Sequence, residues 1–320
     1  MIVTAVIVTY NRSNDVMRCI DSVLGQTFKP ANLIIVNNAS TDDTETRISQ
    51  YFNREGISLE VENLTEICVK QGVHTYIYTN AFNAGGSGGF YIGMKNAHEN
   101  LSSDFVWLMD DDGYPTENCL EQLLTHVDAH DYVMPTSINI LNHDELSWPT
   151  RKRNGKKTIR YEELKNSWGE AMEYVTPFNG VLLSRKIISS VGYINKDFFI
   201  WGDEYEHYWR CVEAGFKPMT LLSARFYHPA QKLPFVRICF GLFAVPYADS
   251  PLRMVCLARN YTYIYRHYKQ IYKIPLKWIM YWWLFIITRH GDFEGWRLYK
   301  ASVKDGFRED FTRHLQYLNK

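Results

Sequence analysis

The sequence predicts an α/β protein whose mostly parallel sheet is flanked by helices and followed by a helical C-terminal extension. Short, continuous runs of β-branched and apolar residues alternate with amphipathic segments over residues 1–230, as in strands buried on both faces of a parallel sheet. After Pro234 these runs stop, and aromatic, basic and apolar residues mix at helical spacing. We therefore expect an α/β domain over 1–230 and a helical domain over 231–320.

The elements follow in order from these patterns. The run TAVIVTY (4–10) predicts the first strand, and Val16, Ile20 and Val23 lie on one face of the helix that follows it. The later segments are strands at 32–40, 74–80, 104–110 and 218–229, helices at 40–52 and 88–100, a strand and helix within 174–192, and a strand or turn and then a helix within 197–215. Residues 147–164 are polar and contain glycine, so we expect a mobile loop there.

Composition narrows the class of partner. The 320 residues carry no net charge, which argues against a nucleic-acid-binding protein. Residues 231–320 nevertheless hold 15 Lys and Arg against 6 Asp and Glu. The six cysteines form no C-x-x-C pair and the N-terminus shows no signal peptide, so we expect reduced thiols and a cytoplasmic protein.

Three consecutive carboxylates follow the apolar run FVWLM, at the carboxyl end of an expected strand. Ligand sites of parallel sheets lie at that end. In an extended backbone, residues two apart point the same way, so Asp110 and Asp112 can converge on a cation that prefers oxygen ligands, such as Mg²⁺ or Mn²⁺. A solvated acidic turn that includes Asp111 is the alternative for this motif.

Two further stretches carry candidate site residues. Four of the positions 85–89 are glycine, and we expect a loop before a helix that lets a ligand approach the backbone, rather than a plain connection. Asp203, Glu204 and Glu206 lie among aromatic residues, where lost hydration raises the basicity of a carboxylate. A charged first helical turn is the alternative there. His228 ends the last expected strand, and a metal site at the acidic triplet would give it a role.

These motifs occur in the same order in a known family. The segments VIVTYNR, IVNNASTDDT, the glycine-rich stretch, LMDDDG, FFIWGDEYE and YHP resemble inverting family-2 glycosyltransferases of the GT-A fold, which is Rossmann-like. The resemblance covers about residues 1–230 and extends to bacterial galactofuranosyl- and rhamnosyltransferases of cell-surface polysaccharide synthesis. The tail, with CLARNYTYIYRHY, resembles the helical end of that subgroup more weakly.

The resemblance implies a role for each matching residue. Asn37 stands where the family usually has Asp, so the resemblance leaves open which nucleotide base, uracil or thymine, the donor carries. For the donor, the implied residues are Thr9, Asn37, Asp110 and Asp111, to which we add Gly85 and Gly86; for Mn²⁺ or Mg²⁺ they are Asp110, Asp112 and His228; for the general base, Glu204 or Asp203; and for the acceptor, Trp201, Asn179 and Gly180.

The implied reaction is transfer of galactofuranose from UDP-galactofuranose to a hydroxyl of a growing, lipid-linked surface glycan. Rhamnose from dTDP-rhamnose is the alternative donor. A nucleotidyltransferase would have a basic, glycine-rich loop after the first strand, where TYNRSND stands instead. Loss of the acids near residue 203 would favour a non-catalytic sugar-binding module, but these acids are present.

The tail also suggests a membrane surface. Residues 270–293 join Lys273, Lys277 and Arg289 to a cluster of Trp and Tyr, as in helices that lie in the headgroup region. The apolar run WIMYWWLFII has ten residues, which is too short to span a bilayer. We therefore expect peripheral attachment at the inner face of the cell membrane. A helix packed on the catalytic domain, or a contact within a homo-oligomer, is the alternative.

Overall fold

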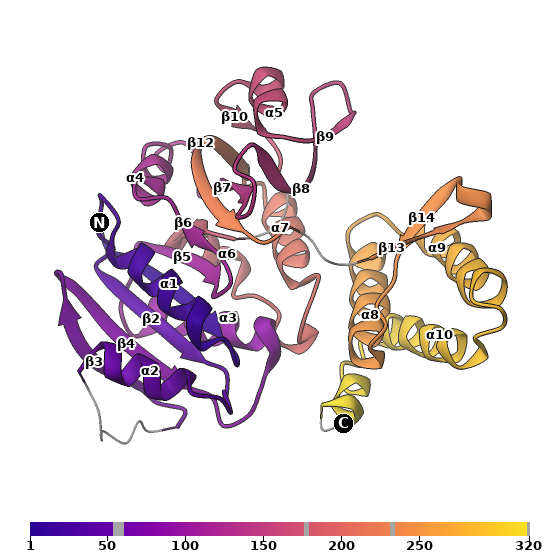
Figure 1. The fold of residues 1–320 in the computed structure, drawn as a ribbon, viewed down its shortest axis with the longest axis horizontal. Coiled ribbons are helices and arrows are strands. Elements are labelled where there is room, and N and C mark those ends of the chain that lie inside the picture. The colour runs from indigo at the N-terminus through magenta and orange to yellow at the C-terminus, as the bar shows by residue number, and fades with distance from the viewer. Residues whose placement is uncertain (54–60, 176–178, 231–233, 319–320) are drawn as a thin grey trace. The chain divides into compact units, whose positions relative to one another are not determined.

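The computed structural model divides the chain into two units (Figure 1). The residues that it describes are 1–53, 61–175, 179–230 and 234–318. The N-terminal unit comprises Met1–Lys196 and His207–Gln231, and the C-terminal unit comprises Asp197–Glu206 and Lys232–Lys320. The short segment with Trp201, Asp203 and Glu204 therefore groups with the C-terminal residues, although we expected it within the α/β domain.

One large sheet forms the centre of the N-terminal unit, in the order β10-β12-β7-β11-β5-β1-β2-β4-β3. Its strands are β1 (Val3–Thr9), β2 (Asn32–Asn37), β3 (Leu64–Lys70), β4 (Val73–Thr79), β5 (Phe105–Asp110), β6 (Tyr114–Pro115), β7 (Tyr132–Asn139), β8 (Glu145–Arg151), β9 (Lys157–Arg160), β10 (Ala171–Met172), β11 (Val181–Ser184) and β12 (Met219–His228). The central pairs β5–β1, β1–β2 and β2–β4 are parallel, whereas β11 and β3 run antiparallel to their neighbours. The predicted α/β class is confirmed.

Helices cover both faces of this sheet, which explains why its central strands are apolar throughout. The helices are α1 (Ser13–Leu24), α2 (Thr44–Tyr51), α3 (Gly85–Glu99), α4 (Cys119–Leu124), α5 (Tyr161–Trp168), α6 (Arg185–Val191) and α7 (Asp203–Glu213). Alternate residues of β1 point to opposite faces. Ile7 joins the core cluster that contains Ile20 of α1, and Val6 joins the cluster that contains Met94 of α3.

Helix α3 begins at Gly85, three residues before the expected start at residue 88, so the loop that we expected at 85–87 is wrong. Gly85 has a positive φ of 70°. A Cβ on Gly89 would lie 2.4 Å from Cγ1 of Val8, and one on Gly93 would lie 2.2 Å from Cγ1 of Val6. Two glycines of this helix therefore allow α3 to pack closely on β1, which is a structural reason for glycine that needs no ligand.

Two other expectations fail because the sequence pattern is weak. The expected mobile loop at 147–164 is strands β8 and β9 followed by α5, and the indole of Trp168 donates a hydrogen bond to the carbonyl of Arg151 at 2.8 Å. Strand β3, which we did not expect, is only partly buried, so it lacks a continuous apolar run. Half-buried strands with mixed polarity give a weaker signal than the central ones.

After Pro234 the C-terminal unit continues with a β-hairpin, although we expected helices there. Its elements are β13 (Phe235–Ile238), β14 (Phe243–Pro246), α8 (Pro251–His267), α9 (Lys273–Trp282), the π-helical segment η3 (Trp283–Thr288), α10 (Phe293–Arg308) and the short helix η4 (Arg313–Tyr317). The unit has its own core, with Met254, Leu284 and Val303 among its members. Over the described residues, every helix falls short of the length and hydropathy that crossing a membrane requires.

Candidate active site

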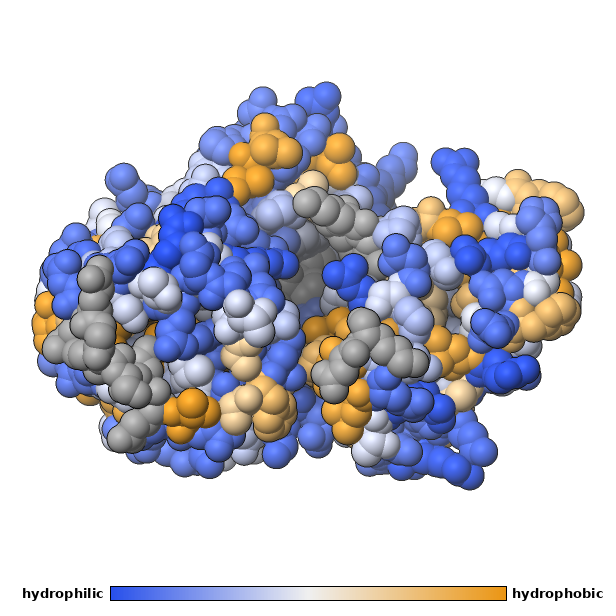
Figure 2. All heavy atoms as spheres, turned by 60° about the horizontal axis from the view of Figure 1, so that its bottom comes forward, coloured by the Kyte–Doolittle hydropathy of each residue, from blue (hydrophilic) through white to orange (hydrophobic). Residues whose placement is uncertain are grey.

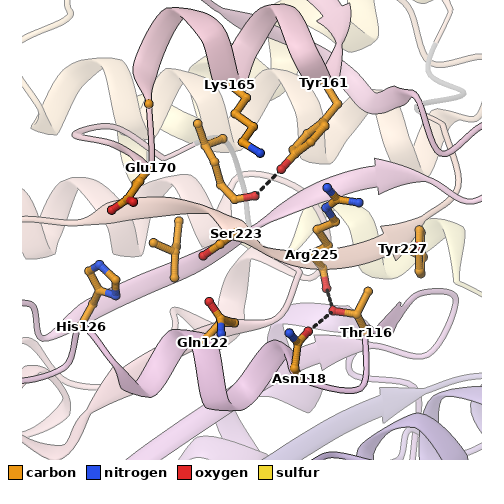
Figure 3. A pocket seen from close by; sticks show the side chains of 13 residues that line it. Thr116, Asn118, Gln122, His126, Tyr161, Lys165, Glu170, Ser223, Arg225 and Tyr227 are labelled. Atoms are coloured by element: carbon orange, nitrogen blue, oxygen red, sulfur yellow. Dashed lines mark hydrogen bonds between the residues drawn. The ribbon is translucent and has the colours of Figure 1, made fainter.

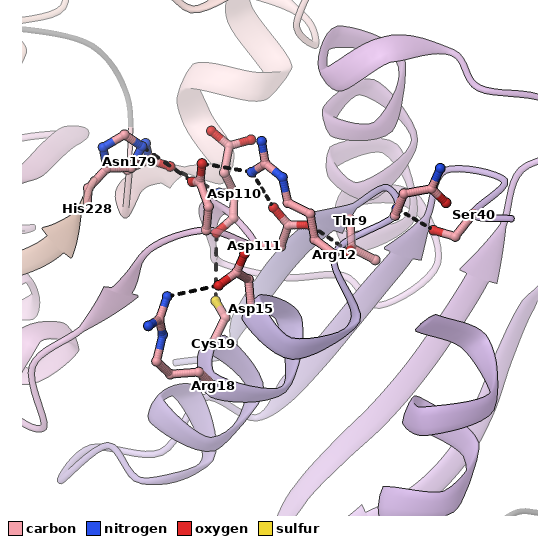
Figure 4. A network of polar contacts seen from close by, with 12 residues as sticks. Thr9, Arg12, Asp15, Arg18, Cys19, Ser40, Asp110, Asp111, Asn179 and His228 are labelled. Carbon is pink, nitrogen blue, oxygen red and sulfur yellow. Dashed lines mark hydrogen bonds and ion pairs between the residues drawn. The ribbon is translucent and has the colours of Figure 1, made fainter. Parts of the chain in front are cut away.

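The carboxyl ends of β1 and β5 bring the acidic triplet together with Thr9 (Figure 4). The two strands pair in parallel with Val8 opposite Asp110, so both end at the same edge of the sheet. Thr9 donates a hydrogen bond from Oγ1 to Oδ2 of Asp111 at 2.7 Å, and both side chains are buried. The neighbouring strand therefore holds Asp111 at the edge where α/β proteins bind ligands.

A basic residue that the sequence motifs did not single out lies among these carboxylates. Nη1 of Arg12 is 3.0 Å from Oδ1 of Asp111 and 2.7 Å from Oδ2 of Asp112. The Arg12 side chain is still 47% exposed, so its charge also faces solvent. The signal was a basic residue directly after the first strand, in TYNR, because that position lies at the same sheet edge. A guanidinium there suits the phosphates of a nucleotide.

The clustered carboxylates disfavour one another's charge. Burial, with the charges of Asp112 and Asp111, raises the pKa of Asp110 to about 7. Burial also raises the pKa of Asp111 to about 6, although Arg12 and Thr9 oppose it. Burial acts to raise the pKa of Asp112 as well, but His228 and Arg12 outweigh it and lower that pKa. A cation bound beside Asp110 would relieve the repulsion.

Asp112 and His228 meet although they are far apart in the sequence. Nε2 of His228 lies 3.4 Å from Oδ1 of Asp112. This oxygen is buried and has no hydrogen-bond partner among the described residues. Nδ1 of His228 is 2.7 Å from the carbonyl oxygen of Pro229, and a carbonyl only accepts, so Nδ1 carries the proton. Burial lowers the pKa of His228, but Asp112 outweighs it and raises that pKa, so the carboxylate favours a second proton on Nε2. A cation that displaced this proton would find a lone pair on Nε2, as in many metal-bound histidines.

The residues at this edge fit a divalent cation, although the described residues hold no preformed group of three ligating side chains. The unpartnered oxygen of Asp112 and Nε2 of His228 are two of its donors. Asp110, which precedes them on β5, is the third residue that the sequence predicts. Carboxylate oxygens with one imidazole are a donor set that Mn²⁺ accepts.

The predicted nucleotide residue Asn37 is fully buried, and its amide is engaged within the protein. Nδ2 donates to a carboxylate oxygen of Glu45 at 3.1 Å, and Oδ1 accepts from the backbone N–H of Ser40 at 3.0 Å. Asn37 therefore shapes the turn after β2. Its role towards the base of a donor stays a prediction.

Gly85 and Gly86 begin α3, and a second missed residue holds that start in place. Nδ2 of Asn38 donates to the carbonyl of Gly85 at 2.9 Å, and its Oδ1 accepts from the N–H of Ala84 at 3.0 Å. A Cβ on Gly86 would meet no atom within 4 Å, so this position has free space beside it. The second Asn of NNAS, directly after a buried strand, was the available signal.

Of the predicted acceptor residues, Asn179 and Gly180 lie against β5. Oδ1 of Asn179 accepts from the backbone N–H of Asp110 at 3.1 Å, and the N–H of Gly180 donates to the carbonyl of Leu108 at 2.9 Å. Gly180 has φ 79°, and a Cβ there would lie 2.8 Å from the ring of Phe226. The structure therefore brings this pair to the acidic triplet. Its role towards an acceptor stays a prediction.

The candidate bases lie in the C-terminal unit, at the start of α7. Asp203 is 5% exposed and Glu204 is partly exposed. Oε2 of Glu204 accepts a hydrogen bond from the backbone N–H of Gly202 at 3.1 Å. Glu206 is buried and accepts from the hydroxyl of Tyr268 at 2.5 Å. Glu206 therefore has a partner of its own, and the choice between Asp203 and Glu204 as base stays open.

An open groove of about 550 Å³ lies on the N-terminal unit and is lined by residues of α4, α5 and β12 (Figure 3). The hydroxyl of Tyr161 donates to the carbonyl of Leu222 at 2.8 Å, and that of Thr116 donates to the carbonyl of Arg225 at 3.2 Å. The guanidinium of Arg225 also lies over the ring of Tyr161, at 4.4 Å. Because none of the predicted site residues lines this groove, it is not part of the candidate site.

Comparison with known proteins agrees with this geometry. The model of Glycosyl transferase family 2 matches residues 4–191. Galactofuranosyltransferase GlfT1 of Mycolicibacterium smegmatis is 28% identical over 319 residues, which are 98% of this chain and 98% of that protein.

Two solved structures are similar in fold. S. aureus TarS 1–349 in complex with UDP has a TM-score of 0.53 and 12% identity, covering 98% of this chain and 89% of that one. Mannosyltransferase PcManGT from Pyrobaculum calidifontis, in complex with GDP-Man and Mn²⁺, has a TM-score of 0.51 and 12% identity, covering 94% and 73%. The expected GT-A fold is confirmed. The protein is a glycosyltransferase, so the nucleotidyltransferase and the sugar-binding module are set aside, and the chain belongs to Glycosyl transferase family 2.

Proposed function

We propose that this glycosyltransferase transfers galactofuranose from UDP-galactofuranose to a hydroxyl of a growing surface glycan, with inversion at the anomeric carbon. The observation that carries the proposal is the cluster of Asp112, His228 and Arg12 at the sheet edge, where a cation and phosphate groups can be held together. The sugar is inferred from the name of the near-full-length relative GlfT1, and UDP is the nucleotide bound in TarS.

Asp110, Asp112 and His228 would hold Mn²⁺ or Mg²⁺, and the Mn²⁺ bound in the similar mannosyltransferase supports this assignment. Such a cation, when bound, supplies a Lewis acid that binds the donor diphosphate and offsets its charge as it leaves. Arg12 pairs with the same phosphates through its exposed guanidinium. Thr9 keeps Asp111 in place beside them.

The transfer itself needs one proton to be removed. Glu204 or Asp203 accepts the proton of the acceptor hydroxyl, and the oxygen attacks the anomeric carbon from the face opposite the nucleotide. The new glycosidic bond forms as the bond to the diphosphate breaks, and the electron pair leaves with UDP. One displacement at the anomeric carbon inverts its configuration.

The donor is tested by thermal unfolding with manganese and a panel of nucleotide sugars. At about one hundred times its dissociation constant, UDP-galactofuranose is expected to raise the unfolding temperature by roughly 5 °C and to be converted to UDP when acceptor is added. Stabilisation and turnover with dTDP-rhamnose instead would establish the rhamnosyltransferase. No response to either donor, with or without EDTA, would contradict both assignments.

A membrane surface is the proposed location, because it suits a lipid-linked acceptor. At the tip of the β13–β14 hairpin, Phe240 is 95% exposed and Leu242 is 78% exposed. The ring of Phe240 lies 5.5 Å from that of Trp283 in η3, and Ile279 of α9 is 60% exposed. Figure 2 shows apolar side chains gathered at the edge of the C-terminal unit, beside hydrophilic ones. Lys277 and its basic neighbours add attraction to anionic lipid.

Binding to vesicles tests this location. The protein is expected to sediment with phosphatidylcholine vesicles that contain about one-third phosphatidylglycerol, and the double variant F240E/L242E should bind at least about tenfold more weakly because it loses two apolar side chains from the interface. The matched control is Leu141→Glu, which changes a 91% exposed leucine of the N-terminal unit and should leave binding intact. Equal binding of all three proteins, or a hairpin variant that changes only the oligomeric state, would overturn the membrane assignment.

A further inference from the structure

The backbone that leads into α7 has an unusual conformation. Phe199 and Trp201 have positive φ angles of 67° and 63°, and Gly202 follows with φ 90°. Residues with a bulky side chain rarely adopt the left-handed region, so surrounding contacts must hold two aromatic residues there. The next two residues of the chain are the candidate bases Asp203 and Glu204.

Asn260 of α8 supplies those contacts from inside the C-terminal unit. Its side chain is fully buried, and Nδ2 donates to three carbonyl oxygens, those of Phe198 at 3.0 Å, Ile200 at 3.0 Å and Trp201 at 2.7 Å. Three backbone acceptors of one short segment therefore converge on a single amide. No other neutral side chain of this size offers an NH₂ group of this kind.

Arg259 fixes which way that amide points. Its Nε donates to Oδ1 of Asn260 at 2.8 Å, so the NH₂ group must face the three carbonyls. Nη2 of Arg259 also donates to the carbonyl of Phe198 at 2.9 Å, and Nη1 lies 2.9 Å from Nδ1 of His314 in η4. The guanidinium is fully buried, which costs hydration that only well-made hydrogen bonds offset.

One peptide group connects Asn260 to Glu204. The carbonyl of Trp201 accepts from Asn260, and the N–H of Gly202, which belongs to the same planar peptide, donates to Oε2 of Glu204 at 3.1 Å. In a trans peptide the C=O and N–H point in opposite directions, and the described chain has no cis peptide. When Asn260 fixes the carbonyl of Trp201, it therefore also fixes the direction of the Gly202 N–H that donates to Glu204.

We propose that Asn260, oriented by Arg259, is a positioning residue that holds the carboxylate of Glu204 for proton transfer through the peptide between Trp201 and Gly202. The proposal rests on the proposed function for the role of Glu204 as base. It adds that the base is held from α8, whose segment CLARNYTYIYRHY resembles the helical end of the family but was given no role at the site. It also favours Glu204 over Asp203, because Glu204 receives the N–H of that peptide.

Asn260→Asp tests the proposal with a nearly unchanged shape. A carboxylate faces the three carbonyls with oxygen only, so the peptide is expected to turn and Glu204 to lose its donor. We expect kcat for transfer to fall about 10- to 100-fold, with an unchanged dissociation constant for UDP and manganese.

Thr262→Val is the matched control on the same helix. Its hydroxyl is buried and donates to the carbonyl of Ala258 at 2.7 Å, so the variant loses one buried hydrogen bond without touching residues 198–202. It should lower the unfolding temperature but leave kcat unchanged. Arg259→Lys gives a second test if Asn260→Asp does not fold. This variant keeps the positive charge but loses the guanidinium N–H groups that orient Asn260, and kcat is expected to fall about three- to tenfold.

A double-mutant cycle separates this proposal from the proposed function. If Asn260 acts through Glu204, then Asn260→Asp should cost no further activity in a Glu204→Gln background. A further loss of the same size there, or a kcat for Asn260→Asp equal to that of Thr262→Val, would overturn the positioning role. Failure of the wild-type protein to transfer sugar from any donor would instead refute the proposed function, because that measurement does not involve Asn260.

Discussion

Asp112→Ala is expected to abolish sugar transfer and to leave the fold intact. Oδ1 of Asp112 is buried without a hydrogen-bond partner among the described residues, and Nε2 of His228 lies beside it. Removing the carboxylate removes the negative group that this histidine and Arg12 share, and with it the firmest predicted ligand of the cation. A metal contributes several kcal/mol to such a reaction, so a loss of at least about 10³-fold in kcat is expected.

The fold survives this change for a physical reason. The side chain is the last of three adjacent carboxylates, so deleting it relieves repulsion on Asp110 while it removes two ion pairs, one with Arg12 and one with His228. Transfer is measured as release of UDP over a manganese titration, and folding as the unfolding temperature without donor. Asp15→Ala is the matched control, since it removes a carboxylate of α1 that pairs only with Arg18 among the ion pairs of the described residues. Normal turnover of Asp112→Ala would remove the metal assignment.

Glu204→Gln is expected to bind the donor normally and to lose transfer. Glutamine keeps an oxygen that can accept the N–H of Gly202, so the backbone before α7 should stay in place. It cannot accept a proton from the acceptor hydroxyl, and general-base catalysis contributes about 10²- to 10⁴-fold, so kcat should fall by that factor. Donor binding is followed by thermal unfolding with UDP and manganese, and transfer by formation of the glycan product.

Two further variants decide which carboxylate is the base. Asp203→Asn should keep most of its activity if Glu204 is the base, and the roles are exchanged if Asp203→Asn is the inactive variant. Glu213→Gln is the control, because it changes an exposed carboxylate at the other end of the same helix. A fall in kcat for Glu213→Gln comparable with that for Glu204→Gln would mean that helix stability, and not proton transfer, was being measured.

The parts of the fold that the sequence predicts are those with a strong local pattern. Strands β1 and β2 are buried throughout, and β5 is buried except at its two end residues, because helices cover both faces of the sheet. Their continuous apolar runs therefore predict where each strand lies in the sequence and where it ends. The β13–β14 hairpin and strand β3 carry mixed polarity and were missed. Local periodicity is weak where a strand is only partly covered. Strand β7 is buried throughout but was missed as well, because Pro135, Thr136 and Ser137 interrupt its apolar run.

The site divides in the same way. Asp112 and His228 are recognisable as candidates because each lies at the end of an apolar strand, and the structure brings them together. Arg12 was overlooked because a single basic residue after a strand is a common surface feature. The segment CLARNYTYIYRHY contains Asn260, but the role of this residue could not be found from it, since its three acceptors lie about sixty residues earlier in the chain.

The grouping of Asp197–Glu206 with Lys232–Lys320 limits how such enzymes can be recombined. A chimaera that joins residues 1–230 of this chain to the tail of another glycosyltransferase would inherit the acid-bearing turn of α7 but lose the arginine and asparagine that brace it. Exchange of tails between relatives should therefore give active enzymes only when residues 197–206 are exchanged together with residues 232–320.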